Sequence, residues 1–190
     1  MELVVNAEEL RAYFWGNMYL SSIQQGIQAQ HCTAELFVAY PSYHNKAFDL
    51  YTWAEEYKTS ILLNGGYSSQ LRELYQFFSH EDNPYPYAQF HESNEALDGA
   101  LTCVGIVLPK CVFDGIVHNL SINGSPGTLQ QLAPDMISKD DYDHYLNTGE
   151  WRSITIGEPR HLEHGAYVSA DLSWWEYNMA LRLKQYSLAR

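Results

Sequence analysis

The stretch Gln24-Gln25-Gly26-Ile27-Gln28-Ala29-Gln30-His31-Cys32-Thr33-Ala34-Glu35 lies where we expect a strand to give way to a helix. Four of its polar side chains recur at a spacing that stacks them on one face of a helix: Gln24, Gln28, His31 and Glu35. A histidine in such a line can orient a water molecule or transfer a proton near neutral pH. The stretch therefore predicts either a reactive histidine or the ordinary polar rim of a half-buried helix, because apolar residues run beside the line.

Upstream of this stretch, the sequence predicts two short elements. The pattern from Asn6 to Glu9 is typical of a helix start, with a capping residue followed by Glu, and it predicts a helix that runs to about Trp15. Met18 to Ser22 is short and apolar enough for a strand. The helix of the opening stretch, expected from about Ile23 to Tyr40, ends before Pro41, which cannot continue it.

Downstream, helices and strands alternate at intervals typical of a layered α/β domain. We expect helices at 47–57 and at 68–79, the second with Ser68 or Ser69 as its cap. We expect strands at 58–63, 87–92 and 101–108, the first of them stopped by the turn sequence Asn64-Gly65-Gly66. The order predicts an α/β fold with a mixed four-stranded sheet and flanking helices.

The chain divides into three parts on this prediction. Residues 1–17 form an N-terminal helical extension, residues 18–109 form the α/β domain, and residues 110–190 form a less regular C-terminal extension. The last part ends in an amphipathic helix from Asp171, with Trp174, Tyr177 and Leu181 on one side. We expect this aromatic stripe to pack onto the core of the protein itself.

Charge limits the partners of the chain. The net charge is −12, and residues 1–108 carry only four Lys or Arg against 13 Asp or Glu. Affinity for nucleic acid comes largely from Lys and Arg contacts to phosphates, so this charge disfavours tRNA as a partner. It is more typical of a soluble cytosolic protein, or of a protein whose partner is itself basic.

Composition gives several further expectations. A length of 190 residues with 46% apolar content suits one globular domain with an elaboration. The sequence contains no apolar run of membrane-spanning length and no signal-peptide pattern at its start, which predicts a cytoplasmic protein without a membrane partner. Cys32, Cys103 and Cys111 show no CxxC spacing, so we expect neither a disulfide framework nor a zinc site.

Two other polar clusters are weaker signals. His161 and His164 stand close in sequence, but Pro159 and Gly165 beside them indicate a loop, and we interpret the pair as a coincidence. The acidic run 140–143 lacks the glycine and the terminal Glu of a calcium loop, so we interpret it as a solvated helix start. We expect no metal and no cofactor.

The order of elements and several short motifs resemble the type II peptidyl-tRNA hydrolases, in particular their divergent branch in bacteria and phages. The segment 27–32, followed by Ala34-Glu35, is similar to the Ala-Gln-x-x-His-Ala type motif on the first helix of that family. The segments 58–63, 71–75, 87–92 and 101–106 are similar to later elements of the family. The resemblance covers residues 18–109.

The resemblance implies hydrolysis of the ester that joins a peptide to tRNA, without a cofactor. It implies His31 as the base, Glu92 as the group that orients His31 or the water, and Thr102 with nearby backbone amides as oxyanion donors. It also implies that Gln24, Gln28 and Asn94 contact the substrate.

Three positions depart from the family pattern. Gln24 stands where enzymatic members carry a lysine, which removes a phosphate-facing charge and a proton donor. Glu92 replaces an aspartate, and Asn94-Glu95 replaces a Thr-Gln pair. These differences bear on tRNA binding in the same direction as the acidic charge.

Two hypotheses therefore stand, and the sequence leaves open whether the chain is an enzyme. The first is a divergent peptidyl-tRNA hydrolase whose C-terminal extension supplies tRNA contacts through Lys110, Arg152, Arg160, Arg182 and Lys184. The second is a non-catalytic interaction or inhibitor protein, encoded by a phage, that reuses the fold. It binds a host protein through an acidic, aromatic-rich surface, for which the chain offers 15 Tyr and 5 Trp.

Overall fold

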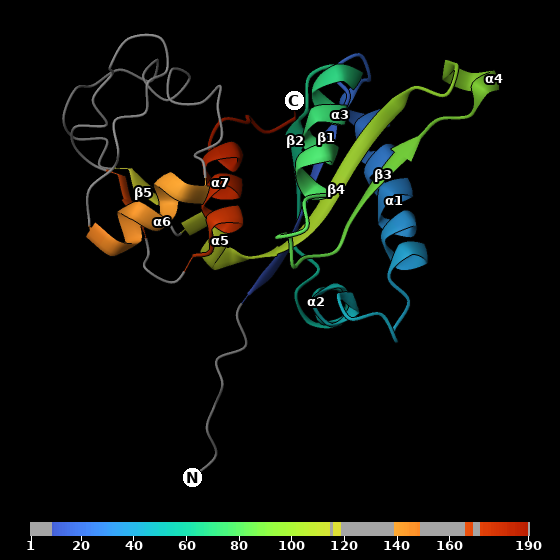
Figure 1. Cartoon of the computed structure of the whole chain (residues 1–190). Coiled ribbons are helices and arrows are strands. Elements are labelled where there is room, and N and C mark those ends of the chain that lie inside the picture. The colour runs from blue at the N-terminus through green and yellow to red at the C-terminus, as the bar shows by residue number, and fades with distance from the viewer. Residues whose placement is uncertain (1–8, 115, 119–138, 149–165, 169–171, 190) are drawn as a thin grey trace, which may run out of the picture. The chain divides into compact units, whose positions relative to one another are not determined.

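A computed structural model of the chain describes residues 9–114, 116–118, 139–148, 166–168 and 172–189 (Figure 1). The chain separates into two units. The first unit contains the described residues up to Lys110 together with residues 186–189, and the second contains those from Cys111 to Gln185. The polar stretch of the opening helix belongs to the first unit.

The first unit is built on a mixed four-stranded sheet in the order β2-β1-β4-β3. Its strands are β1 (Leu10–Gly16), β2 (Ser60–Asn64), β3 (Tyr87–His91) and β4 (Leu101–Pro109). β1 runs parallel to β2, and β4 is antiparallel to both of its neighbours, β1 and β3. The predicted α/β class, with a mixed four-stranded sheet and flanking helices, is confirmed.

The first strand corrects two predictions. Leu10–Gly16 forms β1, so the helix expected from Asn6 to about Trp15 is wrong over the described residues. The strand expected at Met18–Ser22 is wrong as well, because Met18 and Tyr19 lie in an exposed turn that leads into the first helix. Six of the seven β1 residues are buried, since the strand is central and covered on both faces. The sequence of such a strand is a continuous apolar run without the alternation of a half-buried strand. The predicted domain boundary at residue 17 therefore separated β1 from the sheet to which it belongs.

The opening stretch forms α1 (Ser22–Ala39), close to the predicted bounds. Ser21 caps the helix: its side chain accepts a hydrogen bond from the Gln24 N–H, and the Gln24 side chain accepts one from the Ser21 N–H. The buried face of α1 consists of Gln25, Gln28, Cys32 and Leu36. Only Gln28 of the polar line lies on this face, so the other three members of the line lie at the surface.

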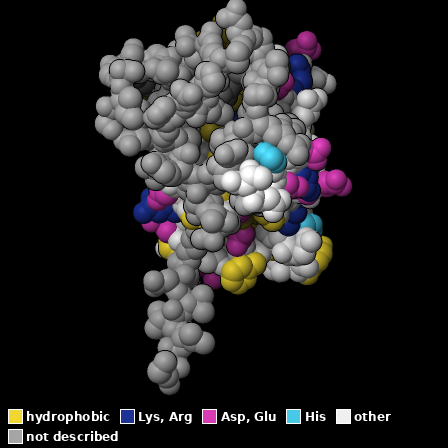
Figure 2. Space-filling view, turned by 60° about the vertical axis from the view of Figure 1, so that its left-hand side comes forward, with side chains coloured by type: hydrophobic (Ala, Val, Ile, Leu, Met, Phe, Trp, Pro, Cys, Tyr) yellow, Lys and Arg dark blue, Asp and Glu magenta, His cyan; other side chains and the backbone are white. Residues whose placement is uncertain are grey.

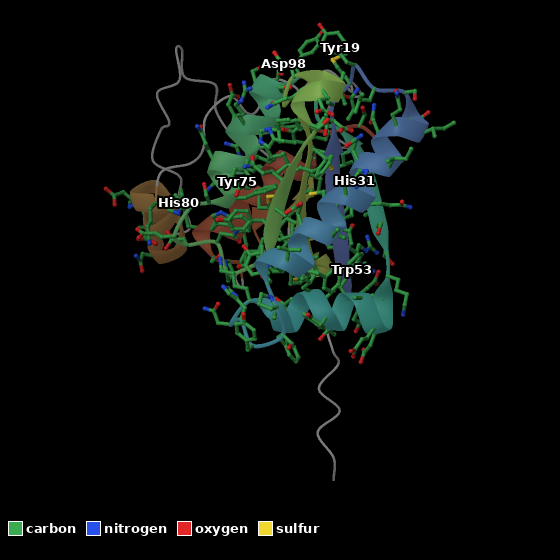
Figure 3. All side chains as sticks on the ribbon, turned by 90° about the vertical axis from the view of Figure 1, so that its right-hand side faces the viewer. Tyr19, His31, Trp53, Tyr75, His80 and Asp98 are labelled. Atoms are coloured by element: carbon green, nitrogen blue, oxygen red, sulfur yellow. The ribbon has the colours of Figure 1, made fainter. Side chains whose placement is uncertain are left out.

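The two faces of the sheet are covered by different helices, as Figures 1 and 3 show. On one face, α1 packs with Phe14, Ala88 and Val107 into one apolar cluster. On the other face, α3 (Ser68–Phe78) buries Phe78 against Trp15, with ring centroids 5.5 Å apart. Each strand residue therefore belongs to either the α1 layer or the α3 layer.

Glycine is required at one position in the middle of β4. A Cβ on Gly105 would lie 2.7 Å from Cδ1 of Phe14 and 3.1 Å from Sγ of Cys32. Both neighbours are buried in the α1 layer, so a side chain at this position would push α1 away from the sheet. The missing side chain at Gly105 therefore sets how closely α1 approaches β1 and β4.

The remaining elements of the first unit follow the predicted order. The expected helix at 47–57 is α2 (Ala47–Thr52) continued by a π-helical turn, η1 (Trp53–Tyr57), which ends at Lys58 with a φ of 55°. The short helix α4 (Asn94–Leu97) separates β3 from β4. The helix α5 (Lys110–Asp114), most of which belongs to the second unit, follows β4 directly.

The second unit contains a two-stranded antiparallel sheet of β5 (Ile116–His118) and β6 (Ala166–Val168), with helices α6 (Lys139–Thr148) and α7 (Trp174–Leu183). The acidic run begins α6, and its residues Asp140 and Asp143 are exposed as predicted. The predicted C-terminal helix is α7, capped by Ser173 and Glu176. His161, His164, Arg152 and Arg160 lie outside the described residues.

Among the described residues, no helix combines the length and the hydropathy that a membrane crossing requires. Over the same residues, no three His, Cys, Asp or Glu side chains come together in an arrangement that could hold a metal ion.

Candidate functional site

A hydrogen-bonded chain joins three of the predicted site residues. Gln28, on the buried face of α1, donates from Nε2 to Oε1 of Glu92 at 2.7 Å. Its own Oε1 accepts a hydrogen bond from Oγ1 of Thr102 at 3.1 Å. The structure therefore brings together residues that are 64 and 74 positions apart in the sequence, from the first helix and the last two strands.

Thr102 is the buried end of this chain of hydrogen bonds. It is 1% exposed, and its hydroxyl lies 3.1 Å from Oε1 of Gln28 and 3.3 Å from the carbonyl oxygen of Phe90. The hydroxyl hydrogen is thus directed at acceptors inside the protein. In this arrangement Thr102 holds the Gln28 side chain in place, and it does not present a donor at the surface.

Glu92 is the outer end. It follows β3 directly and is half-buried, and its Oε2 accepts a hydrogen bond from the Ser93 N–H at 3.3 Å while Oε1 is held by Gln28. Its own backbone N–H donates to the Ala100 carbonyl at 3.0 Å. Backbone and side chain are therefore both fixed, and the carboxylate stands where α1, β3 and α4 meet.

His31 lies about one turn further along α1 than Gln28. Its ring is at the surface and stacks on Phe90, with centroids 4.6 Å apart and an interplanar angle of 19° (Figure 3). Among the described residues, none forms a hydrogen bond with the imidazole. The ring is therefore oriented by an apolar contact while both nitrogens remain accessible, which a base acting on a water molecule requires.

Gln24 and Asn94 lie apart from this chain. Gln24 is exposed on the first turn of α1, where its side chain caps the helix through Ser21. Asn94 is the exposed first residue of α4, and its carbonyl accepts the Asp98 N–H at 3.2 Å. Both positions lie in the first turn of a helix. Their roles as substrate contacts remain predictions.

Asn17 is a site neighbour that the sequence did not reveal. It follows β1, is 5% exposed, and donates from Nδ2 to Oγ of Ser68 and to the Leu101 carbonyl. Its backbone N–H donates to the Thr102 carbonyl at 2.9 Å, so it positions the start of β4. The signal was a polar residue directly after a buried aromatic run, which the predicted helix at this position concealed.

A groove of about 390 Å³ runs beside this neighbourhood along β3. It is lined by β3 itself, by Glu35 and Ala39 of α1 and by Tyr75 of α3. His31, Glu92 and Thr102 are not among its walls, although Phe90 belongs to both the groove and the stacking contact of His31. The expected cleft around the three predicted residues is thus displaced along the strand.

The Cys32 thiol near the site is not a nucleophile at neutral pH. A hydrogen bond with Cys103, together with burial, raises the pKa of Cys32 well above its usual range. Both side chains are fully buried, Cys32 on α1 and Cys103 on β4.

Several basic side chains of the described residues are already engaged. Lys110 and Arg11 both form ion pairs with Glu9, with N–O distances of 3.4 and 2.9 Å. Lys184, in the second unit, lies 3.4 Å from the centre of the Phe113 ring, and burial lowers its pKa. Among the described residues on the face shown in Figure 2, Lys and Arg side chains lie beside Asp and Glu and form no patch of their own.

The buried face of α7 differs in part from the predicted stripe. Tyr177 is 2% exposed, whereas Trp174 and Leu181 are half-buried. Trp175, which the predicted stripe did not include, is fully buried.

Comparison with models of known protein families and with curated proteins finds no match to this chain.

Proposed function

We propose that the chain hydrolyses the ester bond of peptidyl-tRNA, with His31 as the general base. The observation that carries this proposal is the bridge that Gln28 makes between Glu92 and Thr102, about one helical turn from an exposed histidine. The resemblance to type II peptidyl-tRNA hydrolases implies a site made from the first helix and the last two strands. Gln28, Glu92 and Thr102 come from those elements.

The proposed reaction needs a positioned water, a base and a leaving hydroxyl. The free nitrogen of His31 takes a proton from water as the oxygen attacks the carbonyl carbon of the peptide ester. The C–O bond to the ribose then breaks, and the imidazolium returns the proton to the departing ribose oxygen. In this proposal Glu92 orients the attacking water, and Gln28 and the Ser93 N–H hold its carboxylate in place.

Thr102 receives a different role from the one that the resemblance implies. Its hydroxyl is buried and directed at Gln28, so we assign it to positioning. Removal of its hydroxyl should therefore act through Gln28 and Glu92 and should not leave an oxyanion without its donor.

The hydrolysis of an N-blocked aminoacyl-tRNA at low salt tests the proposal. His31→Ala should lower the rate by about 10²–10⁴-fold, the usual contribution of a positioned general base. Gln30→Ala, at an exposed neighbour on α1 outside the hydrogen-bonded chain, should keep the wild-type rate. Equal rates for wild type and His31→Ala would reject His31 as the base.

A second candidate is supported by the surface of the first unit. Tyr43, Tyr19 and Phe48 are 89%, 81% and 77% exposed, and large exposed aromatic residues are typical of binding surfaces. This favours a non-catalytic interaction protein. Absence of both hydrolysis and tRNA binding in the wild-type protein would select this candidate.

A further inference from the structure

The sheet has two edges, and only one of them has a partner strand among the described residues. At the β2 edge, the tail of the chain pairs antiparallel through Leu63 and Leu188. β3, at the other edge, pairs on one side with β4 and on its other side with no described strand. The edge of β3 is therefore open over the described residues.

The register shows which backbone groups the open edge presents. The Val107 N–H donates to the Pro86 carbonyl, and Ala88 and Phe90 stand opposite Gly105 and Cys103. In an antiparallel pair, alternate residues direct their backbone groups at the partner strand. Tyr87 and Gln89 consequently direct theirs outward.

Gln89 is the centre of this edge. The outward backbone of Tyr87 is hydrogen-bonded to the Tyr40 side chain, which leaves the N–H and carbonyl of Gln89 as the outward pair in the middle of β3. A strand added to an edge makes its hydrogen bonds to such groups, and side-chain pockets beside them supply the specificity.

The groove along β3 offers those pockets. Tyr75 and Phe90 provide aromatic walls from the two faces of the sheet. Glu35 is an exposed carboxylate in the same groove, and among the described residues it has no ion-pair partner. An extended chain with alternating apolar and basic side chains matches these walls.

The charge of the chain favours a basic segment over a second copy of the chain as the occupant of this edge. Each copy carries a net charge of −12, so pairing of two β3 edges would bring two acidic surfaces and two Glu35 side chains together. A basic segment gains from the same charge. Electrostatic complementarity therefore favours a partner of opposite sign.

We propose that the β3 edge binds an extended, basic segment of another protein as a fifth strand, with Lys or Arg of that segment against Glu35. The tail of the chain pairs with the β2 edge in the same way, through backbone hydrogen bonds. The inference goes beyond the proposed hydrolysis and does not depend on it.

The probe is a fluorescein-labelled, N-acetylated peptide of alternating Lys and Val, with a Glu–Val peptide of equal length as its acidic twin. Binding is measured by fluorescence anisotropy. Gln89→Pro removes the outward N–H without touching the β4 ladder and should weaken binding of the Lys–Val peptide by about tenfold or more. Gln89→Ala keeps that N–H and should bind within about twofold of wild type. Glu35→Lys should weaken the Lys–Val peptide and strengthen the Glu–Val peptide.

A second measurement tests the proposal in the wild-type protein, without the Gln89→Pro substitution. In the wild-type protein, the Lys–Val peptide should slow hydrogen exchange at the Gln89 amide. Three results would overturn the inference: no binding of the Lys–Val peptide at millimolar concentration, equal binding by Gln89→Pro, or unchanged exchange at Gln89 in the complex. Sedimentation that shows a dimer lost in Gln89→Pro would assign the edge to a second copy instead.

Discussion

The two edges of the sheet differ in whether a described segment of the chain pairs with them. At the β2 edge, the Asn64 N–H donates to the Ser187 carbonyl, and the Ala189 N–H donates to the Leu62 carbonyl, both at 3.0 Å. At the β3 edge, Gln89 faces a groove between aromatic walls, and His31 stacks on Phe90 at its end. The chain closes one edge with its own tail, and no described strand pairs with the other.

The difference teaches where this fold can carry function. An unpaired edge exposes backbone donors and acceptors and is a hazard for aggregation unless it is short, charged or covered. β3 has only five residues, ends at His91 and has Glu35 beside it. These features limit nonspecific pairing, and the tail makes the same protection unnecessary at β2.

The largest expected effect comes from the residue that ties the open edge to α1. Gln28→Ala should lower the free energy of unfolding by about 1–3 kcal/mol, because Thr102 and Glu92 lose their shared partner. Gln30→Ala, exposed on the same helix, should change it by no more than about 0.5 kcal/mol. Urea denaturation measures both variants. Equal midpoints would mean that the bridge adds nothing to the attachment of α1.

A smaller effect is expected at the closed edge. Ala189→Pro removes the donor to the Leu62 carbonyl and should cost about 1 kcal/mol of stability. Leu188→Pro is the matched control, because the bonds of residues 187 and 189 place the Leu188 N–H on the side away from β2. Thermal unfolding compares the two variants. A larger loss in Leu188→Pro would contradict the pairing of the tail.

A further effect is absent at neutral pH and appears only at alkaline pH, at the start of the open edge. Burial raises the pKa of Tyr40 to about 12, against a backbone hydrogen bond from Tyr87 that lowers it. The folded state therefore holds this proton more tightly than the unfolded state, whose tyrosines titrate near about 10. The resulting stability is complete below about pH 10 and is lost as the pH rises through about 12.

Tyr40→Phe should consequently lose less stability than wild type between these two pH values. The measurement is urea denaturation at a series of alkaline pH values. Tyr43→Phe, at a side chain that is 89% exposed, is the control and should follow the wild-type profile. A Tyr40→Phe profile that coincides with wild type would show that Tyr40 stays accessible in the folded protein.

Much of this fold could be predicted from the sequence, because breakers and helical spacing marked most elements. Pro41 ends α1, Asn64-Gly65-Gly66 ends β2, and the spacing of Leu71, Leu74 and Phe78 marks α3. β1 could not be predicted in this way. A central strand buried on both faces lacks alternation, and a capping pattern just before it was a stronger local signal.

The candidate site could be predicted only in part, because the orientation of side chains on the first helix depends on long-range packing. Spacing placed Gln28 and His31 on one helix, but it could not show which of the two points inward. That orientation depends on the layer formed by β3 and β4, where Thr102 and Phe90 meet α1. The open edge could not be predicted at all, because strand order is a property of long-range pairing.

Hydrogen exchange measured amide by amide in the isolated protein tests the contrast between the edges most directly. The Asn64 amide and the β4-facing amides of Ala88 and Phe90 should exchange more slowly than the Gln89 amide by about a hundredfold or more. Gln89 protected to the same degree as Ala88 would show that the β3 edge is covered. Asn64 as fast as Gln89 would show that the tail does not close the β2 edge, and either result would contradict the account.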